Sequence, residues 1–126
     1  MSKILLIDDD PQVLNIFKQY LSKAGHTVTT ACNGLQGMRL LARDSFDLII
    51  TDILMPECDG LELLRTLRTT PDRPRIIAIS GGSSFISPML LLDLAGKLQA
   101  DKILPKPLDY ETLTQAVWDT LATQCG

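Results

Sequence analysis

Short apolar runs that close on a polar or acidic residue constrain this chain most. Three strong runs are KILLI (Lys3–Ile7), DLIIT (Asp47–Thr51) and RIIAI (Arg75–Ile79), and two weaker ones are TVTTA (Thr27–Ala31) and KIL (Lys102–Leu104). The strong runs do not alternate between polar and apolar residues, as a strand with one solvated face would. They therefore indicate strands that are buried on both faces, which is typical of a parallel sheet.

Amphipathic stretches separate these runs and predict helices. The first helix has Asp10 as its N-cap and Pro11 as its first residue, and it ends near Gly25. The next helices cover about 35–42, 61–67 and 88–98, and the last is capped by Asp109 and extends to about 121. Asp followed by Pro is typical of a helix start, and Gly of a helix end. Five strand–helix units with right-handed crossovers predict an α/β protein with a doubly wound five-stranded parallel sheet, as a three-layer sandwich.

Composition narrows the classes of function. The 126 residues fit one domain, and 12 Lys and Arg against 15 Asp and Glu give a net charge of −3. Without a basic run, direct nucleic-acid binding is not expected. The first apolar run is too short for a signal peptide or a membrane span. Three scattered cysteines and one histidine fit neither zinc nor disulfides, so we expect a cytoplasmic protein.

Chemically active side chains follow the predicted strands. Asp8 and Asp9 follow the first strand, Asp52 the third, Ser80 the fourth and Lys106 the last. Because function gathers at the carboxyl ends of strands in open α/β sheets, these residues are expected to share one edge. Crowded carboxylates repel, and a hard divalent cation such as Mg²⁺ relieves the repulsion. An Asp, a metal, a hydroxyl and a Lys together suit phosphoryl transfer to a carboxylate.

Four motifs resemble the receiver domain of two-component response regulators. They are ILLIDDD, DLIITDILMPECDG, the AIS ending of the fourth strand and ILPKP, and the likeness extends from Lys3 to about Thr123. The resemblance implies a flavodoxin-like (βα)5 fold and a single receiver domain over residues 1–126, without an output domain in this sequence. The alternatives are a stand-alone regulator and a receiver fragment of a larger regulator. It also implies a signalling domain rather than an enzyme. Its partners would be a histidine kinase or histidine phosphotransfer protein and a downstream protein target.

The resemblance also assigns the metal and the phosphoryl group. Asp52 would be the phosphoacceptor. Asp9, Asp52 and the main-chain carbonyl of Leu54 would ligate Mg²⁺ or Mn²⁺ directly, and Asp8 would act mainly through water. The cation would be needed for transfer from a phosphohistidine onto Asp52, and the acyl phosphate would then hydrolyse.

Further positions follow from the same resemblance. Ser80 would be the switch hydroxyl and Lys106 the phosphoryl-binding lysine, with the Lys106–Pro107 peptide in the cis form. The position three residues before the lysine usually carries an aromatic in this family and here is Ile103. We therefore expect switching to be carried by the Gly81-Gly82 loop and the start of the following helix, because glycine permits large backbone changes.

Four positions carry expectations about the hydrolysis rate and about partners. Leu54 and Gly82 flank the path of the attacking water and cannot orient it by a side-chain hydrogen bond, so hydrolysis should be slow. Met89 and Leu92 fall outside the apolar stripe of their predicted helix. They are candidates for a partner interface or for a homodimer through the face of the fourth helix, fifth strand and fifth helix. Burial under residues 83–87 is the competing interpretation.

Three other classes share parts of this pattern. A phosphohydrolase of the haloacid dehalogenase type needs a second Asp two positions after its nucleophile, where this chain has Leu54. A flavodoxin needs a phosphate-binding loop of Ser, Thr and Gly where this chain has Asp8-Asp9-Asp10-Pro11. A degenerate receiver is disfavoured because Asp52, Ser80 and Lys106 are all present.

Overall fold

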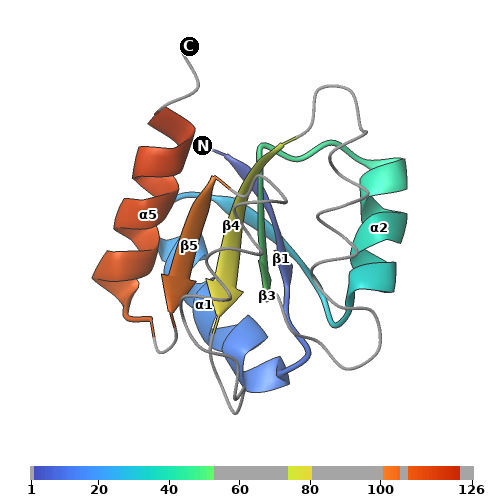
Figure 1. Cartoon of the computed structure of the whole chain (residues 1–126), viewed down its shortest axis with the longest axis horizontal. Helices are drawn as coiled ribbons and strands as arrows, with labels where there is room; N and C mark the ends of the chain where they lie inside the picture. Colours follow the sequence, from blue (N-terminus) through green and yellow to red (C-terminus); the bar gives the residue numbers. More distant parts are fainter. Residues whose placement is uncertain (1, 53–73, 81–100, 106–107, 123–126) are drawn as a thin grey trace.

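A computed structural model describes residues 2–52, 74–80, 101–105 and 108–122, and these residues contain one five-stranded parallel sheet (Figure 1). The strands are β1 (Lys3–Ile7), β2 (Thr27–Ala31), β3 (Leu48–Asp52), β4 (Arg75–Ser80) and β5 (Lys102–Pro105). The described helices are α1 (Pro11–Lys23), α2 (Gly34–Arg43) and α5 (Tyr110–Ala122). The spatial order is β2-β1-β3-β4-β5, which confirms the doubly wound fold class.

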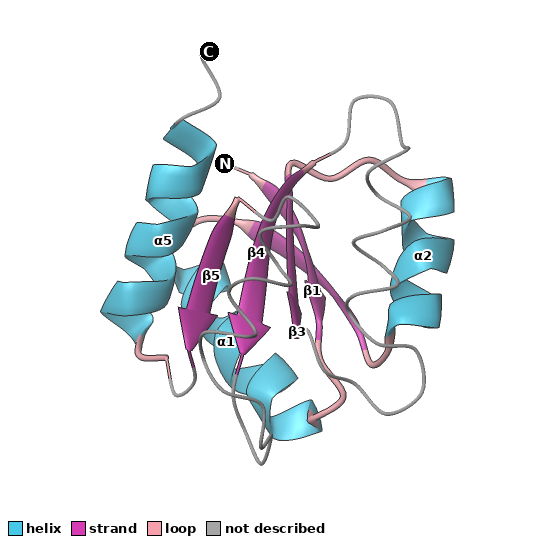
Figure 2. Cartoon of the chain, in the orientation of Figure 1, coloured by secondary structure: helices cyan, strands magenta, loops and turns pink. Residues whose placement is uncertain are grey.

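Helices cover the sheet from both sides, as Figure 2 shows for α5 and α2. On the side of α1 and α5, alternate strand residues such as Leu6, Ile50 and Ile77 join Phe17 and Val117 in the larger core. On the side of α2, the other strand residues join a smaller core, with members Leu5, Ile7, Ala31, Phe46, Ile49 and Ile76. Because successive side chains point to opposite faces, continuous apolar runs supply both layers.

Local side-chain bonds fix the helix starts. The Asp10 carboxylate accepts a hydrogen bond from the Gln12 N–H at 2.9 Å, and Pro11 is the first residue of α1. At the start of α2, Asn33 accepts from the Gln36 N–H at 2.7 Å, while the Gln36 side chain accepts from the Cys32 N–H at 2.6 Å. This reciprocal arrangement satisfies two backbone donors that the helix itself leaves without partners.

The ends of the last helix and the first also follow from local chemistry. The Thr112 N–H donates to the Asp109 carboxylate at 2.7 Å, and the hydrogen bonds from Thr112 lower the pKa of Asp109. Helix α1 ends at Lys23, two residues before Gly25, whose φ of 98° lies in the left-handed region that favours glycine. The predicted caps at Asp10 and Asp109 are thus confirmed.

Three predicted strands were wrong by one residue at their carboxyl ends, and one of them also at its start. Strand β3 begins at Leu48 and includes Asp52, β4 includes Ser80, and β5 includes Pro105. The reason is that sheet pairing continues past the apolar runs: Asp52 pairs with Ile79, and Ser80 with Pro105. Asp52 and Ser80 therefore belong to the sheet rather than to the loops after it. The helices predicted at 61–67 and 88–98 lie outside the described residues.

Across the described parts of the chain, no helix is both long enough and apolar enough to cross a membrane.

Candidate functional site

Three carboxylates meet where the two central strands end. Asp8 directly follows β1, and Asp52 is the last residue of the adjacent strand β3. The pairing of Ile7 with Thr51 brings these two aspartates to the same level of the sheet. Together with Asp9, each offers a carboxylate oxygen within 4.8 Å of the others. The structure thus brings together the three acidic residues that the sequence analysis selected.

The three carboxylates differ in exposure and support. Asp8 is 1% exposed and Asp52 is 5% exposed, whereas Asp9 lies on the surface. The Asp10 N–H donates to the Asp8 carboxylate at 2.9 Å, and the Asp8 N–H donates to the Ala31 carbonyl at 3.1 Å. These bonds hold Asp8 between the start of α1 and the end of β2. Two buried carboxylates and one exposed carboxylate therefore form a site that is open to solvent on one side.

The donor set fits a small divalent cation. Opposite ligands of an octahedral Mg²⁺ lie about 4.2 Å apart, because each Mg–O distance is about 2.1 Å. Oxygens within 4.8 Å of one another can therefore reach a common ion with small side-chain adjustments. Burial of like charges is unfavourable without a cation, since desolvation and mutual repulsion both oppose the ionised form. The residues present thus suit a hard cation with oxygen ligands.

The other predicted site residues are placed less fully. Ser80 ends β4 and pairs with Pro105 of β5, so its backbone lies on the same sheet edge as Asp52. Ile103 is half-buried on β5 and pairs with Ala78. The remaining candidates lie outside the described residues, as does the Ser80 side chain: Leu54, Gly82, Met89, Leu92, Lys106 and Pro107.

The sequence analysis missed one polar group beside the cluster. The Thr51 hydroxyl, on a fully buried residue, donates to the main-chain carbonyl of Asp52 at 3.1 Å. The available signal was a hydroxyl in an otherwise apolar strand, because the residues before it, Leu48, Ile49 and Ile50, are all apolar.

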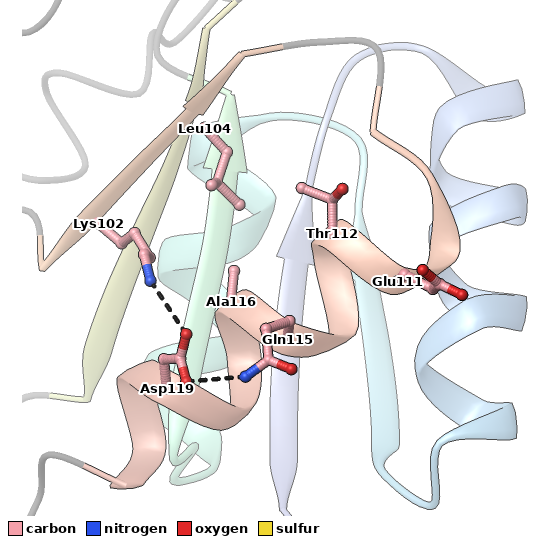
Figure 3. Close-up of a pocket in the computed structure, with 7 residues that line it drawn as sticks. All are labelled: Lys102, Leu104, Glu111, Thr112, Gln115, Ala116 and Asp119. Carbon is pink, nitrogen blue, oxygen red and sulfur yellow. Dashed lines mark hydrogen bonds and ion pairs between the residues drawn. The ribbon is translucent and has the colours of Figure 1, made fainter.

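A separate groove of about 460 Å³ lies between β5 and α5 (Figure 3). Leu104 and Ala116 contribute apolar surface to it. Lys102 forms an ion pair with Asp119 at 3.6 Å, and the Gln115 amide donates to Asp119 at 2.9 Å. Glu111 and Thr112 also line it. No sequence motif predicted this groove, because β5 contributes alternate residues to it and α5 contributes residues at helical spacing.

Comparisons with known proteins agree with this geometry. Residues 4–118 match the family model described as the response regulator receiver domain. The chain is 37% identical over 117 residues to the transcriptional regulatory protein CpxR of Escherichia coli, covering 93% of this chain and 48% of CpxR. It is 38% identical over 111 residues to the response regulator MprA of Mycobacterium ulcerans, covering 88% of this chain and 46% of MprA.

Solved structures give the same result. A CheY-like receiver domain protein from Methanospirillum hungatei matches with a TM-score of 0.88 and 26% identity, covering 98% of this chain and 96% of that one. The response regulator TrrA of Thermotoga maritima, solved in complex with Mg²⁺ and BeF, matches with a TM-score of 0.81 and 28% identity, covering 95% and 99%.

The chain belongs to the response regulator receiver domain family, whose members are phosphoacceptor signalling domains. It spans about half of the length of CpxR and MprA, and 26% of the length of the regulator GlrR from Escherichia coli. The expected family and fold are thus confirmed, and nothing favours the phosphohydrolase alternative.

Proposed function

We propose that Asp52 accepts a phosphoryl group in the presence of Mg²⁺ or Mn²⁺, and that its phosphorylation switches contacts with a downstream protein. The observation that carries this proposal is the convergence of the Asp8, Asp9 and Asp52 carboxylates at the ends of β1 and β3. These three side chains, with the Leu54 carbonyl expected from the family, would hold the cation. When bound, the cation would neutralise negative charge on the phosphoryl oxygens.

The chemistry of the step follows from the acceptor. A carboxylate oxygen of Asp52 forms a bond to phosphorus as the bond between phosphorus and the donor's imidazole nitrogen breaks. The electron pair of that bond leaves with the nitrogen, which is then protonated. In the reset step, water attacks phosphorus, inorganic phosphate leaves, and the Asp52 carboxylate is restored. Both steps depend on positioning and charge neutralisation rather than on further covalent chemistry.

Ser80 and Lys106 complete the proposed site. Ser80 ends the strand beside β3, and its hydroxyl would donate to a phosphoryl group on Asp52, as expected from the family. Lys106 follows β5 directly and would supply a positive charge to the same oxygens. Contacts from both residues to the new phosphoryl group would favour one of two pre-existing conformations of the domain.

The proposed donor is the phosphohistidine of a histidine kinase or of a histidine phosphotransfer protein, in the cytoplasm. For the output, the groove between β5 and α5 supports a protein contact or a homodimer on this side of the domain, with Met89 and Leu92 as further candidates. The groove combines an apolar floor with charged rims, a combination that is common in protein interfaces.

Incubation with acetyl phosphate and Mg²⁺, followed by intact-mass measurement, tests this function. The wild-type chain should gain one phosphoryl group, and hydroxylamine should remove it because it is an acyl phosphate. Asp52→Ala should gain none. Glu111→Gln, which removes an exposed carboxylate from α5, is the matched control and should be labelled like the wild type. Equal labelling of Asp52→Ala would refute Asp52 as the acceptor.

A further inference from the structure

We propose that Thr51 is a positioning residue that holds Asp52 in place for cation binding through a hydrogen bond to the Asp52 backbone. The Thr51 hydroxyl donates to the Asp52 carbonyl oxygen at 3.1 Å, and Thr51 is 0% exposed. The inference rests on the proposed function, because it concerns how the same carboxylate is held against its two neighbours.

The position of Thr51 in the sheet shows why such a bond matters. The paired residues of β1 and β3 run only as far as Ile7 and Thr51, whereas β3 and β4 remain paired one residue further, at Asp52 and Ile79. Asp52 therefore lies just past the last residue pair between the two central strands. The hydroxyl bond of Thr51 adds a constraint on the backbone at that step.

The bond acts on the direction of the Asp52 peptide group. A carbonyl held at a fixed orientation fixes the ψ angle of its own residue, and ψ sets the path by which the chain leaves the strand. Asp8 and Asp9 repel the Asp52 carboxylate at separations within 4.8 Å. A looser backbone would let Asp52 turn away from these two charges, and its oxygen would then leave the common site.

Thr51 acts through the backbone and not by contact with the bound groups. In a strand, successive side chains point to opposite faces, and Ile49, two residues before Thr51, packs in the smaller core with Ile7. Thr51 shares that face, while the Asp52 side chain leaves the strand on the other. Burial of the Thr51 hydroxyl costs free energy, and the hydrogen bond to the Asp52 carbonyl offsets this cost. Thr51 is thus a positioning residue rather than a catalytic one.

The affinity for Mn²⁺ reports on the position of Asp52 without any phosphoryl transfer. It is measured from the decrease of the electron paramagnetic resonance signal of free Mn²⁺ as the ion binds. Thr51→Val keeps the branched shape and removes the hydroxyl, and it should weaken Mn²⁺ binding about 2- to 10-fold, the range expected for one lost hydrogen bond. Thr51→Ser keeps the hydroxyl and should bind as the wild type does. Thr29→Val, the same change in the middle of β2, should have no effect.

A second pair of variants guards against a failure of Thr51→Val to fold. Thr51→Ser and Thr51→Ala both lack the methyl group, and only the serine can donate to the Asp52 carbonyl. Weaker Mn²⁺ binding by alanine than by serine, with a shift of the Asp52 carbonyl ¹³C resonance, supports the positioning role. A merely structural role would lower the stability of both variants and leave their Mn²⁺ affinities equal.

The outcomes separate the two proposals. If the wild type binds Mn²⁺ and is labelled on Asp52 but Thr51→Val binds Mn²⁺ equally well, the role of Thr51 is overturned and the proposed function stands. If the wild type binds no Mn²⁺, the cation site and the role of Thr51 are both overturned.

Discussion

The two edges of the sheet differ in how their charged side chains are arranged. Like charges lie together at the carboxyl ends of the strands, whereas opposite charges are paired at the amino ends. At the carboxyl ends, Asp8, Asp9 and Asp52 bring three negative charges together within 4.8 Å. At the amino ends, negative and positive side chains form ion pairs. The Lys3 ammonium forms an ion pair with Asp44, whose pKa this bond lowers.

A second ion pair lies at the amino ends of the strands. The Arg75 guanidinium lies 3.7 Å from the Asp101 carboxylate, which also accepts the Ile76 N–H at 2.8 Å. An exposed pair of opposite charges contributes little to stability, whereas like charges held close together cost free energy that a positive group or a cation offsets. The carboxyl end, where three acidic groups converge, is therefore the end of the sheet at which we propose a cation binds.

The largest expected effect comes from removing one charge at the carboxyl end. Asp8→Asn keeps an oxygen that can accept the Asp10 N–H and should weaken Mg²⁺ binding about 10- to 100-fold, as changes to groups that support a metal's ligands do. Without cation it should raise the free energy of unfolding, on the order of 1 kcal/mol, because a repulsion is relieved. Titration calorimetry with MgCl₂ and urea unfolding measure both.

Asp44→Asn is the matched control at the amino end. It breaks the ion pair with Lys3 and should slightly lower stability while leaving Mg²⁺ affinity unchanged. A loss of stability in both variants would contradict the contrast between the two ends.

The second prediction concerns the packing behind the cluster. A Cβ on Gly37 of α2 would lie 2.5 Å from Cδ1 of Ile7, the residue before Asp8. Gly37→Ala should therefore lower the free energy of unfolding by about 1–3 kcal/mol through overpacking, despite the better helix propensity of alanine. Chemical denaturation with and without Mg²⁺ measures the loss.

Ile7→Val in the Gly37→Ala background provides the test of cause, because it deletes the methyl group that clashes. In a double-mutant cycle, the double variant should lose less unfolding free energy than the two single variants lose together. Additive losses would show that Gly37 does not set how closely α2 approaches β1.

Much of this arrangement was predictable from sequence, for definite physical reasons. Strands β1 and β2 were predicted to the residue, since an apolar or β-branched run with polar neighbours leaves little choice of register. Asp8, Asp9 and Asp52 were predicted to meet, because carboxyl ends of parallel strands share an edge. The predicted end of β3 at Thr51 was wrong because pairing with β4 extends to Asp52, which hydropathy cannot indicate.

Features that depend on three-dimensional contacts were not predictable. The bond from Thr51 to Asp52 requires the geometry of the strand end, and the groove between β5 and α5 requires the angle of the helix on the sheet. The close approach of Gly37 to Ile7 joins residues that are 30 positions apart in the sequence. A hydroxyl in an apolar strand marks Thr51 in the sequence, but residue type alone does not indicate which atom it or the other groups contact.

The third prediction tests chemistry at the carboxyl end. Leu54 cannot orient water by a side-chain hydrogen bond, so the acyl phosphate should be long-lived. Leu54→Asn should shorten its lifetime roughly 10-fold by offering a group that can orient the attacking water. Timed phosphate release from purified, labelled protein measures this. Leu35→Asn, the same change at an exposed position of α2, is the control, and equal lifetimes in all three proteins would contradict the prediction.

The smallest expected effect is a pH dependence at the opposite end of the sheet. His26 directly precedes β2, and its Nδ1 atom is buried without a hydrogen-bond partner among the described residues. Burial, followed by the positive charge of the N-terminus, lowers the pKa of His26 below 6.5. In the unfolded chain the pKa keeps its ordinary value, so the unfolded state binds more protons between the two pKa values.

Stability should therefore fall as the pH decreases through 6.5 and stop falling on this account below the pKa of the folded state. His26→Gln cannot take up this proton, so the difference in unfolding free energy between wild type and variant should be constant above about pH 7.5 and shift against the wild type toward pH 5. Taking the difference removes the contribution of the carboxylates, which titrate in both proteins. Urea unfolding of both proteins between about pH 5 and pH 7.5 measures this difference in unfolding free energy. Parallel curves would show that the buried nitrogen costs nothing to protonate.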